Sequence, residues 1–223
     1  MIDAVIFDLD GTLVDSSDGV LLSFRSAFSA TGLDPVRPVT SAIIGPPLKD
    51  TLSVLAGTED EDTLRALVSE FKTTYDSHCY KRTVPFTGVD EMLRELVGCG
   101  HPLYIATNKR LLPTKRILDH LGWSDVFKGV YALDFFRPPL RRKADMLAQI
   151  VLLHDLDPQH SIYIGDRDED SEAAINNGLH FGFAAWGYGC DGTTMHRSPA
   201  FITMKRPETV AFIISTLCMM PGK

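Results

Sequence analysis

Residues 4–12, with the sequence Ala-Val-Ile-Phe-Asp-Leu-Asp-Gly-Thr, contain the pattern that decides the fold. The first four form a continuous apolar run, which is typical of a strand buried on both faces of a parallel sheet. Asp8 and Asp10 follow, and because ligands bind at the carboxyl ends of parallel strands, we expect both carboxylates to project there. They would repel each other unless a cation or a proton lay between them, and Mg²⁺ prefers oxygen ligands. A polar turn that closes the strand, with Gly11 at a positive φ, explains the same residues.

The rest of the chain repeats an alternation of short apolar runs and amphipathic stretches. Apolar runs of the same kind are found at 102–106, 129–132, 161–165, 180–184 and 200–203. Amphipathic stretches of helical period separate them, at 89–97, 112–121, 143–153 and 168–176. This alternation predicts an α/β fold, with a Rossmann-like parallel sheet and helices on both of its faces.

The region after the first strand departs from this alternation. Helical periods occur there at 17–30, 48–55 and 63–80, separated by turn-rich segments, and no clear strand lies among them. We therefore predict two domains. Residues 1–14 and 86–223 form the α/β core, and residues 15–85 form a small all-helical domain, called the helical insert below.

Composition excludes several classes of protein. The chain has 223 residues, 44% of them hydrophobic and 23% charged, which is ordinary for a globular protein with a sizeable core. Its 22 basic and 29 acidic residues give a net charge of −7, which argues against a general nucleic-acid binder. A small phosphorylated substrate is still compatible with this charge, because one bound cation can reverse the sign of a site.

Cysteine usage and hydropathy favour a cytoplasmic protein that does not contact a membrane. The four cysteines, Cys79, Cys99, Cys190 and Cys218, are scattered and show neither disulfide-scaffold nor zinc-ligand spacing. The N-terminus lacks the basic and apolar regions of a signal peptide. The most apolar tail, residues 210–220, is shorter than the roughly 20 residues needed to span a bilayer and is predicted to be a core helix.

A second acidic cluster strengthens the metal hypothesis. The apolar run 161–165 leads directly into Asp166, Asp168, Glu169 and Asp170. Acidic side chains are favourable at the start of a helix, but one or two would suffice for that purpose. Two acidic clusters, each at the end of a predicted strand, therefore favour a divalent-metal site.

Two further positions suggest binding of an anion. Thr107 and Asn108 follow the apolar run 102–106, where a hydroxyl group and backbone amides could hold phosphate oxygens or could simply cap a helix. Lys143 opens a predicted helix, where its charge opposes the macrodipole and calls for an anionic partner. Arg141 and Arg142 precede it, so an exposed basic loop explains this stretch equally well.

Taken together, four motifs resemble the haloacid dehalogenase (HAD) superfamily, and most closely its phosphoglycolate-phosphatase-like members. They are FDLDGTLVDS from Phe7, ATN from Ala106, Lys143, and GDRDED from Gly165, in the family's order. The resemblance implies an α-helical (C1-type) cap inserted after the first motif, in agreement with the helical insert. The chain departs from the usual pattern at Arg110 and Ala144, where the family often has proline. These departures leave open whether Lys143 or a neighbouring arginine contacts the phosphate.

The resemblance also implies catalytic roles. Asp8 would be the nucleophile that forms an aspartyl-phosphate. Asp10 would be the general acid and base, which protonates the leaving oxygen and then activates water. Thr107, Asn108 and Lys143 would bind the transferring phosphoryl group.

The same resemblance implies Mg²⁺ as the cofactor. Its ligands would be Asp8, the main-chain carbonyl of Asp10, and Asp166. Asp170 would support this site through water or by contacting the ligands, and direct binding by Asp170 stays open.

Substrate choice is expected to depend on the helical insert. The turn Gly45-Pro46-Pro47 opens a short predicted helix and resembles the cap loop that faces the active site in this family. Lys49 could contact a carboxylate or a second phosphate of the substrate, although an exposed surface lysine is the simpler interpretation. Arg25 has a weaker claim to the same role.

We therefore predict an enzyme, a Mg²⁺-dependent phosphatase that hydrolyses a small phosphomonoester through an aspartyl-phosphate. The substrate would be a small phosphorylated metabolite such as a phosphoglycolate-like compound, a nucleotide or a sugar phosphate. The alternatives are a phosphomutase of the β-phosphoglucomutase type, a phosphonate hydrolase and a non-catalytic phosphate-binding protein. The physiological substrate and the oligomeric state stay open, and no nucleic-acid or membrane partner is expected.

Overall fold

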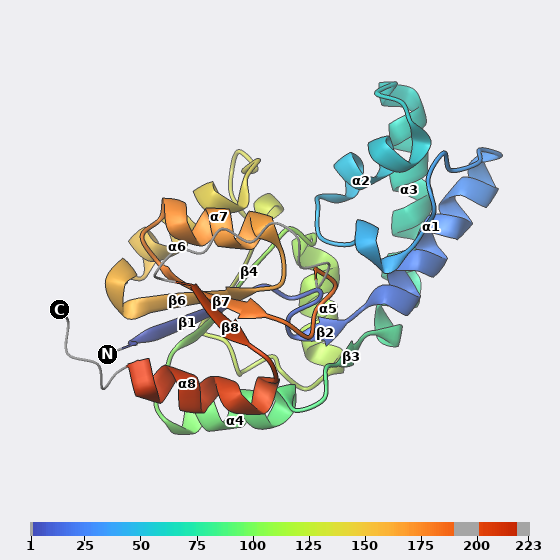
Figure 1. The fold of residues 1–223 in the computed structure, drawn as a ribbon. Helices are drawn as coiled ribbons and strands as arrows, with labels where there is room; N and C mark the ends of the chain where they lie inside the picture. The colour runs from blue at the N-terminus through green and yellow to red at the C-terminus, as the bar shows by residue number, and fades with distance from the viewer. Residues whose placement is uncertain (1, 190–200, 218–223) are drawn as a thin grey trace.

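The core of the protein is a six-stranded, fully parallel sheet with helices on both faces (Figure 1). The computed structural model describes residues 2–189 and 201–217. In chain order the strands of the sheet are β1 (Ala4–Phe7), β4 (Leu103–Thr107), β5 (Gly129–Ala132), β6 (Ser161–Gly165), β7 (His180–Ala184) and β8 (Phe201–Met204). The predicted α/β fold is confirmed.

Strand β1 shows why its sequence forms a central strand. Val5 and Phe7 pack into the core on one face of the sheet, and Ala4 and Ile6 pack into the core on the other face. All four are at most 1% exposed, so successive side chains, which point to opposite faces, are apolar on both. A continuous apolar run is the expected sequence of such a strand.

The strand order creates a switch point at β1. The order is β5-β4-β1-β6-β7-β8, so β4 and β5 extend the sheet to one side of β1 and the three later strands extend it to the other. The chain reverses its direction of growth between β5 and β6. In open parallel sheets, the carboxyl ends of the strands at such a point form a crevice that binds ligands.

Helices cover the sheet in two layers (Figure 1). Helices α4 and α8 pack against one face, and α6 and α7 pack against the other. The helices of the core are α4 (Val89–Gly98), α5 (Leu111–His120), α6 (Lys143–Leu153), α7 (Asp168–Asn176) and α8 (Val210–Leu217). Several predictions from the sequence extend into undescribed residues: Ala200 of the last strand, residues 218–220 of the last helix, Cys190 and Cys218.

The helical insert has a hydrophobic core of its own. It contains α1 (Ser17–Thr31), α2 (Leu48–Ala56) and α3 (Glu61–Ser77). Phe24, Phe28 and Phe71 are among its buried residues, and each is at most 5% exposed. A short antiparallel pair, β2 (Val14–Asp15) and β3 (Val84–Pro85), lies where the chain enters and leaves the helical insert. The sequence did not predict this pair. These features support the proposed division into residues 15–85 and the rest of the chain.

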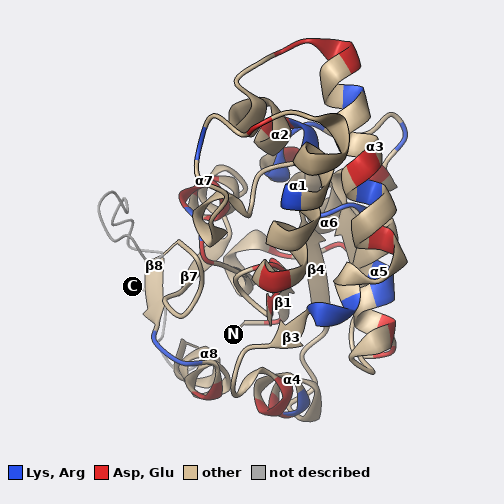
Figure 2. Ribbon diagram, turned by 90° about the vertical axis from the view of Figure 1, so that its right-hand side faces the viewer, with Lys and Arg blue, Asp and Glu red and all other residues tan. Residues whose placement is uncertain are grey.

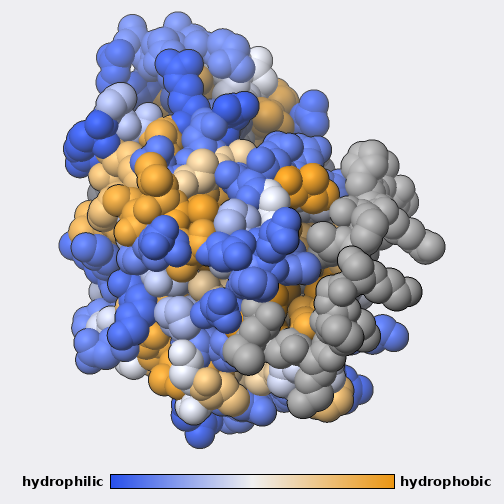
Figure 3. Space-filling model, turned by 90° about the vertical axis from the view of Figure 1, so that its left-hand side faces the viewer, coloured by the Kyte–Doolittle hydropathy of each residue, from blue (hydrophilic) through white to orange (hydrophobic). Residues whose placement is uncertain are grey.

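The surface matches the composition. Figure 2 shows acidic and basic residues interspersed along the helices. Figure 3 shows hydrophobic side chains gathered on part of one face, and Leu152 and Leu153 at the end of α6 are among the exposed large apolar residues of the protein. Within the described parts of the chain, no helix combines the length and the hydrophobicity required to cross a bilayer.

Packing of α1 against the short helix η2 (Cys79–Arg82) requires glycine at position 19. A Cβ atom at Gly19 would overlap the backbone carbonyl oxygen of Cys79, which cannot move as a flexible side chain could. We predict that Gly19→Ala lowers the free energy of unfolding by about 1–3 kcal/mol, because overpacking outweighs the better helix propensity of alanine. Denaturation in urea measures this change.

The matched control is Gly98→Ala at the last residue of α4, where a Cβ atom would have no neighbour within 4 Å. This substitution should leave the free energy of unfolding unchanged or raise it by up to about 1 kcal/mol. Equal stability of the two variants would contradict the proposed close contact of α1 with η2.

Candidate active site

The carboxyl ends of three adjacent strands bring together the residues that the motifs had singled out. Asp8 follows β1, Thr107 ends β4 and Asp166 follows β6, and each is at most 3% exposed. Asp8, Asp166 and Asp170 each place one carboxylate oxygen within 4.8 Å of the other two. The two acidic clusters, which are far apart in the sequence, therefore meet at one buried point beside the switch in strand order.

Lys143 provides the cation at this point. Its ammonium group lies 3.0 Å from Asp8 Oδ2 and 2.6 Å from Asp170 Oδ1, and the residue is 2% exposed. Burial lowers the pKa of Lys143, but Asp170 and Asp8 outweigh this effect, so the pKa lies above its usual value. The anionic partner that the helix position calls for consists of two carboxylates.

The pKa of Asp8 lies close to neutral pH. Burial raises its pKa to about 7, with Lys143 opposing the shift and the charges of Asp170 and Asp166 adding to it. Its Oδ1 accepts a hydrogen bond from Leu9 N at 2.8 Å. The carboxylate is therefore held in place on one side by the backbone and on the other by an ammonium group.

Asp170 is occupied by contacts within the protein. Oδ2 accepts hydrogen bonds from the backbone N–H groups of Asp166 and Arg167, at 3.1 and 3.0 Å. Oδ1 contacts Lys143 and lies 3.1 Å from the hydroxyl group of Tyr163. Because both oxygens already have partners, this geometry favours a supporting position for Asp170, in which it orients Lys143.

Asp166 is held by backbone donors from residues 188 and 189. Its Oδ2 accepts hydrogen bonds from Tyr188 N at 2.8 Å and Gly189 N at 3.1 Å. Burial raises the pKa of Asp166 to about 6, and the neighbouring Asp170 adds to the shift. Gly11, at φ +85°, packs so closely against this carboxylate that a Cβ atom would overlap it. The glycine of the first motif therefore makes room for the second acidic cluster.

Asp10 lies at the border between the core and the helical insert. It accepts a hydrogen bond from Ser16 Oγ at 2.5 Å, and Lys109 Nζ lies 3.0 Å from both of its carboxylate oxygens. The ammonium group of Lys109 also stacks 4.7 Å from the centre of the Tyr75 ring, which comes from α3. Burial lowers the pKa of Lys109, but the charge of Asp10 more than offsets this effect, and the pKa is raised.

Three consecutive residues after β4 connect the core to the helical insert. Asn108 Nδ2 donates to the carbonyl oxygen of Gly45 at 3.1 Å, and Lys109 stacks on Tyr75. Arg110 forms a two-pronged ion pair with Asp76, with distances of 2.9 and 2.5 Å. Both members of this pair are about four-fifths buried. Residues 108–110, which begin with the last residue of the ATN motif, therefore form a polar joint between the α/β core and the helical insert.

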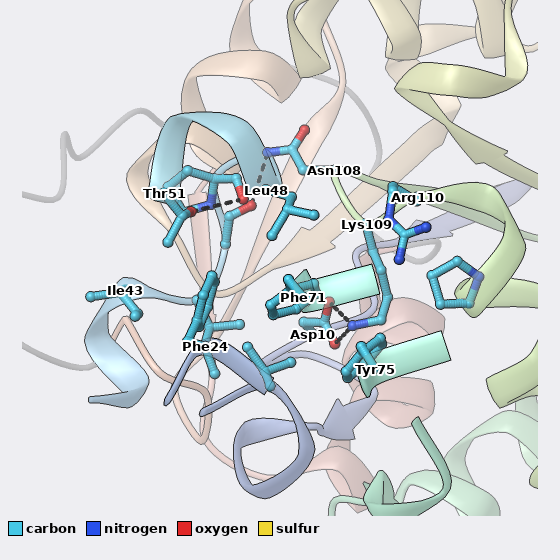
Figure 4. Close-up of a pocket in the computed structure, with 15 residues that line it drawn as sticks. Asp10, Phe24, Ile43, Leu48, Thr51, Phe71, Tyr75, Asn108, Lys109 and Arg110 are labelled. Carbon is cyan, nitrogen blue, oxygen red and sulfur yellow. Dashed lines mark hydrogen bonds and ion pairs between the residues drawn. The ribbon is translucent and has the colours of Figure 1, made fainter. Parts of the chain in front are cut away.

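A cavity lies at this joint (Figure 4). It has a volume of about 500 Å³ with its open mouth included. Asp10, Asn108, Lys109 and Arg110 line its polar side, and side chains of the helical insert line the opposite side. Asp10 therefore borders a space that a ligand could occupy.

The two residues predicted to select the substrate lie elsewhere. Lys49 Nζ bonds to Glu61 at 2.7 Å, and its side chain is 51% exposed. Arg25 is exposed and donates to the carbonyl oxygen of Val39 at 3.2 Å. Neither lines the cavity beside Asp10. A role of either residue in substrate choice stays a prediction without support from this geometry.

The arginines next to Lys143 also point elsewhere. Arg142 forms an exposed ion pair with Asp145, at 2.7 Å, and Arg141 is exposed. The geometry therefore favours Lys143, of the three neighbouring cations, as the one that contacts a phosphoryl group bound at Asp8.

Sequence reasoning gave no site role to Tyr163, Lys109 or Tyr188. Tyr163 is fully buried in an apolar strand, and a tyrosine in that setting needs a hydrogen-bond partner, so its position was a usable signal. Lys109 directly follows the ATN motif, and this position was the signal available for it. Tyr188 bonds to Asp15 and Ser16 through its hydroxyl group, a contact across 172 residues or more that no local pattern reveals.

The amino-acid sequence is similar to those of known proteins along most of its length. A family model described as haloacid dehalogenase-like hydrolase matches residues 5–184. The tyrosine-protein kinase PtkA of Mycobacterium tuberculosis is 32% identical over 188 residues, which are 83% of this chain and 62% of PtkA. The chain thus spans less than two thirds of that relative's length.

Two shorter relatives match along most of their length. The 5′-nucleotidase of Pseudomonas aeruginosa is 30% identical over 199 residues, covering 87% of this chain and 88% of that protein. The phosphoglycolate phosphatase of Rhodobacter capsulatus is 31% identical over 198 residues, covering 84% and 86%. With the four motifs gathered around one buried cluster and the family model matching most of the chain, the protein belongs to the haloacid dehalogenase-like hydrolase family.

Proposed function

We propose that this protein is a Mg²⁺-dependent phosphatase that hydrolyses a small phosphomonoester through an aspartyl-phosphate at Asp8. The observation that carries the proposal is the buried Asp8 carboxylate, 3.0 Å from the Lys143 ammonium group and next to Asp166 and Asp170. An anionic phosphate repels a carboxylate nucleophile, so such a nucleophile needs cations around it. Relatives named as a phosphoglycolate phosphatase and a 5′-nucleotidase support the same class of substrate.

In the first step, an Asp8 oxygen would form a bond to phosphorus while the bond from phosphorus to the leaving oxygen breaks. Asp10 would give its proton to that oxygen, which departs as an alcohol. Lys143 and the hydroxyl group of Thr107 would hold the phosphoryl oxygens, and positioning of this kind supplies much of the catalysis in phosphoryl transfer. In this geometry, Ser16 and Lys109 fix the carboxylate of Asp10.

In the second step, Asp10 would act as a carboxylate and take a proton from water as the water attacks phosphorus. The bond between phosphorus and Asp8 would break, which releases inorganic phosphate and restores the Asp8 carboxylate. The proton that Asp10 gains in this step replaces the one that it gave in the first. Each turnover therefore consumes one ester and one water and produces one alcohol and one phosphate.

The residues present fit a divalent cation. When ionised, the three clustered carboxylates exceed the one ammonium group by two negative charges, and burial raises the pKa of Asp8 and Asp166 accordingly. Asp8, Asp166 and the carbonyl oxygen of Asp10 would supply oxygen ligands of the kind that Mg²⁺ prefers. When bound, Mg²⁺ would neutralise charge on the phosphoryl oxygens.

Several expectations from the sequence belong to this proposal. The partner would be a small phosphorylated metabolite, and its identity is not fixed by the phosphoryl site. The cytoplasmic location indicated by the scattered cysteines stays a prediction, and so does the absence of nucleic-acid and membrane partners. The oligomeric state stays open.

Substitutions of the two first-motif aspartates should separate the two steps. With p-nitrophenyl phosphate and Mg²⁺, we expect Asp8→Asn to lower the steady-state rate by about 10⁴-fold or more, because the nucleophile is lost. Asp10→Asn should release about one equivalent of p-nitrophenol and then stall, since p-nitrophenolate leaves without a proton whereas water still needs a base. Rapid-mixing absorbance measurements show the burst, and acid quenching traps the phosphoenzyme.

Asp168→Asn is the matched control, because Asp168 is an exposed member of the second acidic run. It should retain full activity. Turnover by contaminant-free Asp8→Asn protein would exclude the covalent mechanism. Isomerisation of a sugar phosphate that occurs only with a bisphosphate primer, without phosphate release, would indicate the phosphomutase. Mg²⁺ binding without turnover of any ester would indicate a phosphate-binding protein.

Mg²⁺ should stabilise the protein through the same carboxylates. At about 100-fold excess over its Kd, Mg²⁺ adds about 2.7 kcal/mol to the free energy of unfolding, or about 5–10 °C in Tm for a chain of this size. We expect this rise, relative to EDTA, in the unmodified protein and in Asp168→Asn. Asp166→Asn should lose it, because a neutral amide replaces a proposed ligand. Differential scanning calorimetry measures the shift, and an equal rise in all three proteins would place the metal elsewhere.

A further inference from the structure

The cavity beside Asp10 continues into a row of aromatic rings from the helical insert (Figure 4). Lys109, which contacts Asp10, stacks on Tyr75, and the Tyr75 ring lies 5.4 Å from the Phe71 ring in a stacked arrangement. The Phe71 ring lies 4.7 Å from that of Phe24. All three rings line the cavity. A group attached to the leaving oxygen at Asp10 would therefore meet aromatic surface first.

Apart from Thr51, the other described insert residues that line the cavity have no polar side-chain group. Val20, Ile43, Ile44 and Leu48 contribute aliphatic side chains to the same wall. Phe24, Phe71 and Tyr75 are each at most 5% exposed, so the wall is well fixed before any ligand binds. Apolar walls with a few polar groups at one end are typical of sites that bury an apolar ligand group. Ring-to-ring contacts add specificity for aromatic groups.

The charges that line the cavity are already used. Lys109 is bonded to Asp10, and Arg110 is bonded to Asp76 through both prongs of its guanidinium group. Among the described residues that line the cavity, no other lysine or arginine is present. A leaving group with its own carboxylate, such as that of phosphoglycolate, would have to break one of these pairs or be buried unpaired, and both are costly.

Arg167 offers a competing route for an anionic leaving group. Its Nε and Nη2 atoms are buried and have no hydrogen-bond partner in the described structure. The side chain packs beside Gly45, which lines the cavity, although Arg167 itself does not. A shift of Gly45 would be needed before the guanidinium group reached the cavity. The experiment below therefore includes this residue.

We propose that the substrate is a phosphomonoester whose leaving group is an uncharged, apolar ring compound that is held between Phe24 and Phe71 on one side and Asp10 on the other. The proposal rests on the phosphatase function argued above and specifies its leaving group. It assigns recognition to aromatic side chains of the helical insert, and it excludes compact carboxylate-bearing alcohols as the preferred leaving group.

Benzyl phosphate and phosphoglycolate provide a matched pair of probes. Both are phosphate esters of a primary alcohol, linked through a CH₂–O–P unit, so they differ mainly in whether a phenyl ring or a carboxylate follows. We expect kcat/KM for benzyl phosphate to exceed that for phosphoglycolate by about tenfold or more, in the range that differences in hydrophobic pockets supply. Release of inorganic phosphate in the presence of Mg²⁺ measures both.

Two charge-adding variants test where the preference arises. Ile43→Arg places a cation on the half-buried rim of the cavity, and it should lower the ratio for benzyl phosphate over phosphoglycolate by about tenfold. Val54→Arg adds the same charge to an exposed position on α2 outside the cavity, and it should leave the ratio unchanged. Arg167→Met should also retain the ratio. Equal melting temperatures establish that the variants are folded.

The outcomes separate this inference from the function on which it rests. No hydrolysis of p-nitrophenyl phosphate, benzyl phosphate or phosphoglycolate with Mg²⁺ would overturn both. Hydrolysis with phosphoglycolate preferred, and with that preference lost in Arg167→Met, would overturn the apolar leaving group and leave the phosphatase intact. An unchanged ratio in Ile43→Arg would show that the cavity does not hold the leaving group.

Discussion

Mutual repulsion of three buried carboxylates is the constraint that organises this structure. The parallel register pairs Phe7 of β1 with Ile164 of β6, so the acidic residues that follow the two strands must lie side by side. Lys143 lies between Asp8 and Asp170 and offsets part of the repulsion. At the first position of α6 its charge is unfavourable to the helix dipole, and the two carboxylates compensate for this cost. A buried charge without such partners would be strongly destabilising.

The polar joint after β4 extends this constraint to the helical insert. Asn108, Lys109 and Arg110 each contact a different part of the insert, through Gly45, Tyr75 and Asp76. Lys109 bonds at the same time to Asp10, so the position of the insert and the orientation of the Asp10 carboxylate depend on one another. A movement of the insert away from the core would separate Tyr75 from Lys109 and remove support from the residue proposed to handle the proton. In the proposed mechanism, opening of the insert would thereby be coupled to proton transfer at Asp10.

The sequence predicts those parts of the structure that depend on local patterns. The apolar runs locate all six sheet strands within one residue. The fully buried strands β1, β4 and β6 show the pattern most clearly, because a strand that is buried on both faces is mostly apolar. The motifs also predict that Asp8, Asp166 and Lys143 lie close together, because ligand sites form at the carboxyl ends of the strands beside the switch in strand order. The pair of Arg110 with Asp76, by contrast, joins residues 34 positions apart on different domains, and neither carries a local pattern that names its partner. The two-residue strands β2 and β3 are too short to produce an alternation.

The charged cluster of the core and the apolar wall of the insert differ in how well they tolerate substitution. The phosphoryl end of the site is made of buried charges whose partners are all fixed, and removal of one leaves another uncompensated, which costs several kcal/mol. The proposed leaving-group end has an insert side made mainly of apolar side chains, for which exchanges of similar volume usually cost less than about 1.5 kcal/mol. Substitutions at Phe24, Ile43 or Phe71 can therefore change the shape of the cavity while the cluster around Lys143 stays intact. Under the proposed function, selection of the phosphoryl group would thus depend on a few paired charges in an acidic protein, and selection of the leaving group would depend on packing.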